Sequence, residues 1–169
     1  CSGRWNTRAA LSFVTAPATV VVANSSPEQG ERAAAIRVQD RQARAMFLDL
    51  RRPESIAELV PAVRQAFGRI DILVNSVGII RRGPIEAVSP EDRDAMMAVN
   101  LRGAFLLCRA VGRELIARKH GKIVNVSSNI SQVLQPHRGT YAVTQAGLPH
   151  LTRVLALEWA PHGINVNAI

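Results

Sequence analysis

The 169-residue sequence has only two cysteines and no long hydrophobic run. Its longest apolar segments, such as ATVVVA (18–23) and IDILV (70–74), have the length of strands and fall far short of the roughly 20 residues of a membrane-spanning helix. Cys1 and Cys108 have neither the spacing of metal ligands nor the density of a disulfide framework. These absences predict a soluble, cytoplasmic protein with no metal site and no membrane partner.

A basic-then-apolar leader segment is also absent, and the sequence starts with Cys1 instead of methionine. We therefore expect some N-terminal sequence to be missing.

Aromatic residues make up only 4% of the sequence, and this scarcity matters for the interpretation of its net charge of +8. A strongly basic chain is a candidate for nucleic-acid binding. However, the arginines are spread over several segments, and no aromatic RNA-binding signature accompanies them. We interpret the basic residues as solvated helix faces and predict no nucleic-acid partner.

What the sequence does contain is an alternation of strand-like and helix-like segments. Apolar runs typical of strands lie at 18–23, 43–50, 122–128 and 164–169, and the segment 69–78 contains a further strand with its exit loop. Helical patterns lie between them, at 26–39, 52–68, 89–121 and 140–160. The alternation predicts one α/β domain over 1–169, with a doubly wound parallel sheet and helices on both faces.

In such a sheet, ligands bind beyond the carboxyl ends of the strands. These ends are small or polar in the present sequence: Asn24-Ser25, Asp49-Leu50, Asn75 to Gly78, and Ser127-Ser128. This edge is therefore the predicted binding site.

Five ordered segments of the sequence resemble the short-chain dehydrogenase/reductase family, namely DILVNSVG, MAVNLRGAF, GKIVNVSS, Tyr141 and LTRVLALEWAPHGINVNAI. The resemblance runs from about residue 8 to residue 169. It implies a Rossmann-like fold and an oxidoreductase that transfers a hydride between NAD(P) and the hydroxyl or carbonyl group of a small substrate. The segments VGIIRRGP (77–84) and PEDRDAMMAVN (90–100) are similar to gluconate and deoxygluconate dehydrogenases, which implies a sugar acid or polyol.

The resemblance implies four catalytic positions, of which three are filled. Tyr141 matches the proton-transfer tyrosine, and Ser128 matches the serine that orients the substrate oxygen. Asn100 matches the asparagine that holds a relay water. The fourth position lies on the same helix face as Tyr141, four residues later, and has Gln145 where the family has lysine.

The loss of that lysine affects Tyr141 directly. A phenol titrates near pH ~10, so it is a poor base at neutral pH unless a nearby cation stabilises the phenolate. Gln145 carries no charge, so we expect low activity. Pro149 lies in the same helix, where a proline costs ~3 kcal/mol and crowds the carbonyl of residue 145. We expect one continuous helix with a kink there.

The resemblance also places the cofactor. On the nicotinamide side, Asn75 to Gly78 resembles an Asn-Asn-Ala-Gly turn, with Ser76 and Val77 as departures, and Tyr141 and Gln145 adjoin it. Val77 is bulkier than alanine, which crowds the dinucleotide.

On the adenine side, Asp49-Leu50 resembles the acidic-apolar pair that contacts the adenine ring. Asn24 and Ser25 occupy the position of the ribose-binding acid. Because no acid is present to repel a 2′-phosphate, NADP is slightly favoured over NAD.

The glycine-rich phosphate turn of the family is not recognisable. If AALSF (9–13) is the helix that follows this turn, Arg4 and Asn6 stand where glycines are needed. The resemblance further implies that the first and last strands are missing. The missing first strand would leave a gap in the sheet between the second and fourth strands, unless the segment 11–15 forms a strand there.

Three basic residues are candidates for contact with a substrate carboxylate: Arg81, His137 and Arg138. The alternative is that they are ordinary surface residues of an arginine-rich chain.

Two alternatives to an active oxidoreductase stay open. The first is a catalytically silent relative that pairs as a homodimer or homotetramer through helices 89–119 and 140–160. The second is a fragment without a function of its own.

Overall fold

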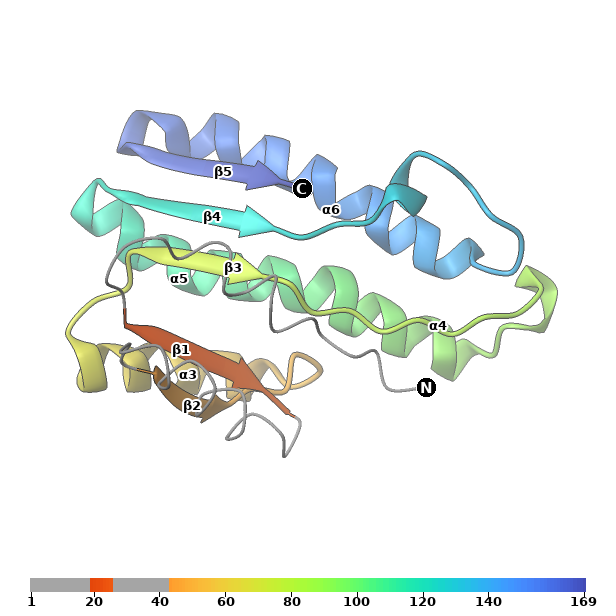
Figure 1. The fold of residues 1–169 in the computed structure, drawn as a ribbon, viewed down its shortest axis with the longest axis horizontal. Helices are drawn as coiled ribbons and strands as arrows, with labels where there is room; N and C mark the ends of the chain where they lie inside the picture. The colour runs from red at the N-terminus through yellow and green to blue at the C-terminus, as the bar shows by residue number, and fades with distance from the viewer. Residues whose placement is uncertain (1–18, 26–42) are drawn as a thin grey trace. The chain divides into compact units, whose positions relative to one another are not determined.

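The computed structural model describes residues 19–25 and 43–169, which form two compact units, one within Cys1–Asp49 and one of Leu50–Ile169. The first unit contains strands β1 (Val20–Asn24) and β2 (Ala43–Phe47). The second contains strands β3 (Ile72–Asn75), β4 (Gly121–Asn125) and β5 (Ile164–Ala168). All described pairs are parallel, as the sequence predicts (Figure 1). That the whole chain is a single domain stays a prediction.

The two-stranded sheet pairs Val20 with Ala43 and ends with Asn24 opposite Phe47. The N–H of Leu48 extends the ladder by donating to the carbonyl of Asn24 (N···O 3.1 Å). Ala43 is buried, and the half-buried Val20, Val22 and Ala45 pack against it. Asn24 and Ser25 therefore leave this sheet at the same edge as Asp49.

In the larger unit the strand order is β3-β4-β5. Helix α5 (Ala104–Arg118) packs against β3 and β4, α6 (Gly139–Trp159) packs against β4 and β5, and α3 (Pro53–Phe67) lies along α5. Figure 1 shows α5 and α6 running behind the strands. These helices form one layer on one face of the sheet.

The grouping of the strands agrees with a doubly wound order. In the order 3-2-1-4-5-6, the second and third strands lie on one side of the first, and the fourth to sixth lie on the other. The described strands form these two groups. The segment 11–15 and the predicted helix 26–39 lie outside the described residues, as do Arg4 and Asn6.

A well-capped helical run lies between β3 and β4. The hydroxyl of Ser89 accepts a hydrogen bond from the N–H of Asp92 (3.1 Å), and Pro90 occupies the first turn. Helix α4 (Pro90–Met97) continues through the π-helical segment η2 (Ala98–Gly103) into α5. The predicted long helix over 89–121 is thus confirmed, with a π-helical segment in the middle that the sequence does not predict.

Helix α6 is also continuous, and Pro149 lies inside it. A restart of the helix at Pro149 is therefore not observed. Short 3₁₀ turns complete the unit, at η1 (Ile85–Ala87), η3 (Asn129–Ser131) and η4 (Ala160–His162).

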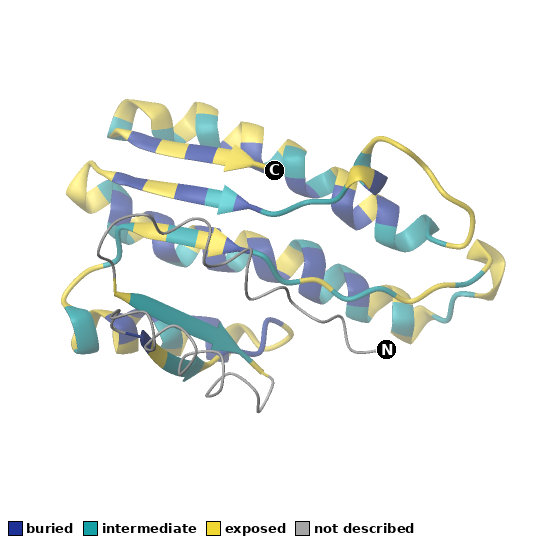
Figure 2. Cartoon of the chain, in the orientation of Figure 1, coloured by how far each residue is buried: buried dark blue, intermediate teal, exposed yellow. Residues whose placement is uncertain are grey.

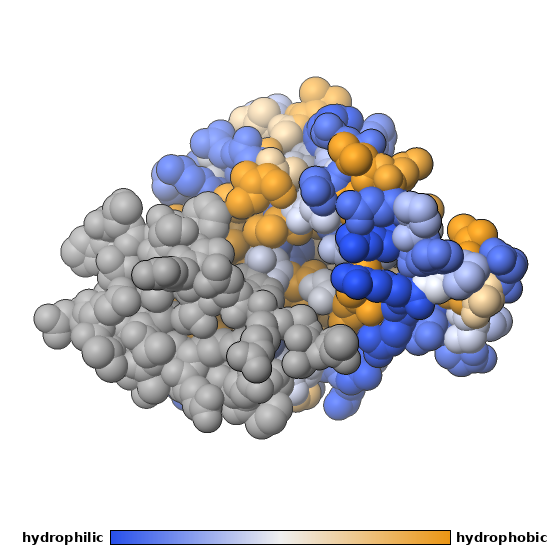
Figure 3. All heavy atoms as spheres, turned by 45° about the vertical axis from the view of Figure 1, so that its right-hand side comes forward, coloured by the Kyte–Doolittle hydropathy of each residue, from blue (hydrophilic) through white to orange (hydrophobic). Residues whose placement is uncertain are grey.

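The core of this unit lies between the sheet and its helix layer. Buried and exposed residues alternate along β4 and β5, as Figure 2 shows, because successive side chains of a strand point to opposite faces. The buried set includes Met96, Leu107, Val111, Leu115, Ile123, Leu148 and Leu155. By length and composition alone the run 90–118 could cross a membrane, but half of its most apolar window is buried inside the unit, as in a core helix. On the described surface in Figure 3, hydrophobic side chains lie in separate groups between hydrophilic ones.

The entry into α3 is held close to the start of α5. A Cβ atom on Gly103 would lie 2.8 Å from the Cβ of Leu50 and 3.0 Å from the carbonyl oxygens of Leu50 and Ala98. Arg102 donates from Nη2 to the carbonyl of Arg51 (2.7 Å). Gly103 therefore allows a close backbone approach that fixes Leu50.

We expect Gly103→Ala to lower the free energy of unfolding by about 1–2 kcal/mol, because two of the three crowded atoms are backbone oxygens that cannot rotate away. Urea denaturation measures the change. Gly83→Ala is the matched control, since a Cβ there meets nothing within 4 Å. Equal stability of the two variants would contradict the close approach.

Candidate functional site

The site begins at Asn100, which is buried in the π-helical segment η2. Its Oδ1 accepts a hydrogen bond from the N–H of Ile79 (2.8 Å), and its Nδ2 donates to the carbonyl of Ile79 (2.9 Å). Nδ2 also donates to Oγ1 of Thr144 in α6 (3.1 Å). Both hydrogens of the Asn100 side-chain amide are thereby engaged in hydrogen bonds. The side chain of Asn100 thus joins the loop after β3 to α6, and we call these three hydrogen bonds the Asn100 clasp.

Thr144 links this clasp to Tyr141. Its hydroxyl donates to the carbonyl of Tyr141 (2.8 Å) and accepts from Asn100. Tyr141 itself is half-buried in the first turn of α6. The predictions above do not include Thr144, although its spacing of three residues from Tyr141 is a signal for a shared helix face.

Gln145 is 3% exposed, and its Oε1 is buried without a hydrogen-bond partner among the described residues. Its Nε2 would lie 3.9 Å from a Cβ placed on Gly78, and Oδ1 of Asn100 would lie 3.6 Å from the same point. The structure thus brings together Gln145, Asn100 and Gly78. A buried carbonyl oxygen without a donor is costly, so this position is suited to a hydroxyl or amine from a ligand.

A second buried carboxamide lies at the end of β3. Nδ2 of Asn75 donates to Oδ1 of Asn125 (3.3 Å), while Oδ1 of Asn75 is buried and has no hydrogen-bond partner in the part of the chain that the structure describes. Asn125 also accepts from the thiol of Cys108 (3.4 Å) and donates to Thr152 (3.0 Å). Burial raises the pKa of Cys108 to about 12, while its hydrogen bond to Asn125 acts in the opposite direction, so the thiol stays protonated and able to donate. Ser76 and Val77 follow Asn75 and are half-buried.

The two serines after β4 have different environments. Ser127 donates from its hydroxyl to the backbone carbonyl of Gln145 (3.0 Å). Ser128 begins η3: its hydroxyl accepts from the N–H of Ile130 and donates to Oδ1 of Asn129, both at a long 3.4 Å. Because η3 packs against α6, Ser128 lies in the loop next to the helix of Tyr141. The hydroxyl of Ser128 is thus the less tightly bonded of the two.

The basic candidates lie on two loops that meet. The N–H of Gly83 donates to the carbonyl of His137 (3.0 Å), and His137 has a left-handed backbone with φ of 63°. Arg138 is the residue before α6. Nε of Arg81 lies 3.2 Å from Oδ1 of Asp92, and both side chains are about half exposed. The guanidinium of Arg81 is therefore already paired with a carboxylate of this chain.

The predicted adenine-side residues are divided between the two units. Asn24, Ser25 and Asp49 belong to the first unit, at the edge where β1 and β2 end, and Leu50 begins the second.

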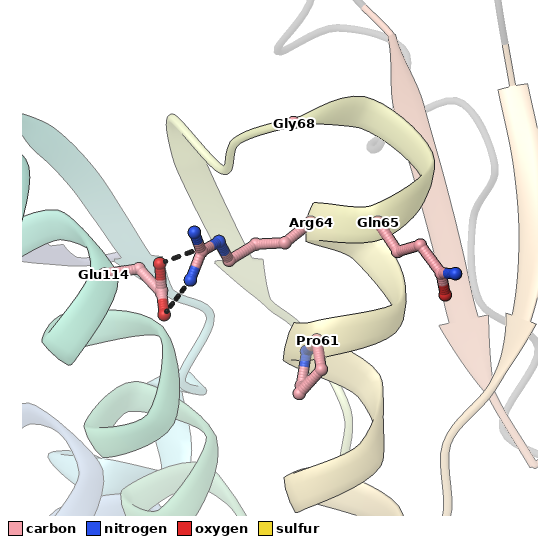
Figure 4. A pocket seen from close by; sticks show the side chains of 5 residues that line it. All are labelled: Pro61, Arg64, Gln65, Gly68 and Glu114. Carbon is pink, nitrogen blue, oxygen red and sulfur yellow. Dashed lines mark hydrogen bonds and ion pairs between the residues drawn. The ribbon is translucent and has the colours of Figure 1, made fainter.

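A surface hollow of about 330 Å³ lies at the other end of β3, between α3 and α5. Figure 4 shows Pro61, Arg64, Gln65 and Gly68 on one side, with Arg64 reaching across to Glu114 (3.3 Å). It contains none of the predicted site residues.

Residues 7–169 match the family model of short chain dehydrogenases. The chain belongs to the short-chain dehydrogenase family. D-threitol dehydrogenase of Mycolicibacterium smegmatis is 37% identical to it over 161 residues, which cover 95% of this chain and 62% of the relative.

Two solved structures extend the comparison. NAD+-bound xylitol dehydrogenase has a TM-score of 0.86 and 28% identity, over 89% of this chain and 58% of its own. Gluconate 5-dehydrogenase of Burkholderia cenocepacia J2315, in complex with NADP and tartrate, has a TM-score of 0.81 and 34% identity, over 88% and 58%. The Rossmann fold of the short-chain dehydrogenases is thus confirmed, and this chain spans about three fifths of the length of these relatives.

We expect Asn100→Ala to lower the free energy of unfolding by about 2–4 kcal/mol. The substitution removes a partner from the partly buried N–H and carbonyl of Ile79 and from the buried hydroxyl of Thr144. Urea denaturation tests this, with Asn165→Ala on the exposed side of β5 as the control. A stability equal to that of the control would show that the clasp contributes little.

Proposed function

We propose that this chain is the dinucleotide-binding part of an NAD(P)-dependent oxidoreductase that acts on a hydroxyl or carbonyl group of a polyol or sugar acid. The observation that carries the proposal is the buried Oε1 of Gln145 beside Gly78, which no residue in 19–25 or 43–169 bonds, in a member of the short-chain dehydrogenase family. The names of the relatives, which act on threitol, xylitol and gluconate, support the substrate class.

The residues around Gln145 fit the nicotinamide-ribose end of a dinucleotide. Its Oε1 can accept a hydrogen bond from a ribose hydroxyl, and the turn from Asn75 to Gly78 offers a backbone without a bulky side chain at Gly78. Asn24, Ser25, Asp49 and Leu50 would hold the adenosine end. When bound, the nicotinamide ring supplies or accepts the hydride. The absence of an acid at Asn24 and Ser25 favours NADP slightly over NAD.

The chain's own residues would orient the substrate and move its proton. The long hydrogen bonds of Ser128 are easily replaced by a shorter one to a substrate oxygen. Tyr141 would donate or accept the proton. Because Gln145 is neutral, the phenolate of Tyr141 lacks the cation that the family's lysine supplies, so we infer slow turnover at neutral pH. Arg81, His137 and Arg138 are the candidates for a substrate carboxylate, in a protein that we expect to work in the cytoplasm.

Titration with NADH and NADPH, followed by nicotinamide fluorescence, tests the proposal without a substrate. We expect saturable binding, somewhat tighter for NADPH. Gln145→Ala should weaken it on the order of fivefold, because one hydrogen bond to the nucleotide is lost. Val133→Ala, in an exposed loop, is the control. If neither nucleotide binds, the proposed function is wrong for this chain, and the alternative of a catalytically silent relative gains support.

Gln145→Lys should restore the cation beside Tyr141. Tyr141 is the single tyrosine of the chain, so tyrosinate absorbance reports on it alone. We expect this absorbance to develop at lower pH in Gln145→Lys than in Gln145→Met, which has similar length and no charge. Oxidation of D-threitol or gluconate should be about 100-fold faster in the lysine variant than in the wild-type chain. Identical titrations of the two variants would show that the charge at position 145 does not act on Tyr141.

We further propose that the chain forms homodimers or homotetramers through α5 and α6. These helices expose large apolar side chains to solvent, the most exposed being Leu157 at 79% and Val143 at 59%, together with Phe105 and Val154. Solvent-exposed apolar residues of this size suit a protein interface.

Light scattering tests this second proposal. The wild-type chain should be at least dimeric, and Leu157→Glu combined with Val143→Glu should yield a monomer, because charges at the centre of an apolar interface are strongly unfavourable. Val133→Glu changes an equally exposed apolar residue in a loop and should leave the assembly intact. A monomeric wild-type chain would contradict the proposal.

A further inference from the structure

Pro149 leaves the backbone carbonyl of Gln145 without its usual helical donor. In an α-helix the N–H of residue i+4 donates to the carbonyl of residue i, and proline has no N–H. In this structure the hydroxyl of Ser127 donates to that carbonyl instead, with an Oγ···O distance of 3.0 Å. A side chain from the loop after β4 thus supplies the bond that the helix lacks.

The loop that carries Ser127 is itself held on both sides. The N–H of Val126 donates to the carbonyl of Asn75 at the end of β3 (2.8 Å), and the N–H of Ser127 donates to the carbonyl of Ile169 after β5 (2.7 Å). The hydroxyl of Ser127 therefore projects from backbone that is fixed by both neighbouring strands. Its hydrogen bond can therefore fix the position of α6 relative to the sheet.

The bonded carbonyl belongs to the residue that lies in the candidate site. Gln145 is almost fully buried, and the neighbouring Thr144 is held by Asn100 from the other side. Two hydrogen bonds at successive residues of α6 thus link it to the π-helical segment η2 and to the loop after β4. One of them depends on an unusual pair, a serine and a helical proline 22 residues apart in sequence.

We propose that Ser127 is a positioning residue, which acts together with Pro149 to hold the Gln145 turn of α6 in the place where its amide meets the cofactor. The inference rests on the proposed function, because it takes the amide of Gln145 as a group that binds the nicotinamide ribose. Ser127 itself contacts neither cofactor nor substrate in this proposal. Its neighbour Ser128 stays available for the substrate oxygen.

The dependence on Pro149 gives a distinctive signature. If residue 149 carries an N–H, the helix satisfies the Gln145 carbonyl by itself, and the hydroxyl of Ser127 becomes dispensable. A serine that merely packs in the loop has no reason to depend on the residue at position 149.

The test is a double-substitution cycle in the full chain, with Ser127→Ala, Pro149→Ala and the double variant. Dissociation constants for NADPH come from fluorescence titration, and amide hydrogen exchange follows the segment 141–148. We expect Ser127→Ala to weaken NADPH binding on the order of fivefold and to speed exchange in this segment about as much. Combined with Pro149→Ala, the same substitution should change either quantity by less than about twofold.

Three matched controls accompany the cycle. Ser127→Thr keeps a hydroxyl at the same place and should retain the wild-type affinity. Pro61→Ala removes the proline inside α3, away from the site, and should not alter the effect of Ser127→Ala. Ser131→Ala, in η3, should leave both readouts unchanged.

Equal effects of Ser127→Ala with and without Pro149→Ala would overturn the proposal. So would a loss of stability in Ser127→Ala with unchanged NADPH affinity, since that result describes a purely structural hydroxyl. If the wild-type chain binds neither nucleotide, the proposed function fails, and the exchange rates of the four chains then decide whether Ser127 and Pro149 are coupled.

Discussion

The side chain of Asn100 is the contact on which the larger unit depends most. It joins the loop after β3, the helical run between α4 and α5, and the first turns of α6, although these segments are far apart in sequence. The π-helical segment η2 places this amide where all three meet, which is a common use of π-bulges near functional sites. This contact and the hydrogen bond from Ser127 to the carbonyl of Gln145 together fix the first turns of α6 relative to the loop that carries Gly78.

The rest of the site is built mainly from neutral amides and hydroxyls. Asn75, Asn125 and Thr152 form a buried chain beneath it, joined by a thiol whose raised pKa keeps its proton. The described ion pairs are at least partly exposed to solvent. Apart from Arg81 with Asp92, they lie away from the candidate site, such as Arg118 with Asp71 at the opposite end of β3, where the hydrogen bond from Arg118 lowers the pKa of Asp71. A site of this kind orients groups well but gives little help to a developing charge, which fits the replacement of lysine by Gln145.

Much of the fold could be predicted from the sequence, because it rests on local signals. Ser89-Pro90 begins α4, Gly68 ends α3, and the apolar runs became strands with polar residues at their ends. The family and its Rossmann fold followed from ordered motifs, and the comparisons confirm both. The strand predictions were too long at the carboxyl ends, since β2 stops at Phe47 and β4 at Asn125. Beyond these residues the chain passes into the loops that carry side chains such as Ser127 and Ser128.

The parts of the site that the sequence does not predict all depend on contacts between distant segments. The bond between Asn100 and Thr144 spans 44 positions, and the ion pair of Arg81 with Asp92 joins a loop to a helix. Pro149 indicates that a carbonyl in α6 lacks its donor, but only the structure identifies Ser127 as the replacement.

The parallel pairing of the strands also has a consequence for how the chain folds. Asn75 and Asn125 lie 50 positions apart, so their contact closes a long loop and a whole crossover helix must first be in place. Helix α5, in contrast, is stabilised by contacts within a few residues and can form early. We therefore expect folding to be limited by assembly of β3, β4 and β5, and the unpaired backbone of these strands to be open to association with other chains until that step is complete.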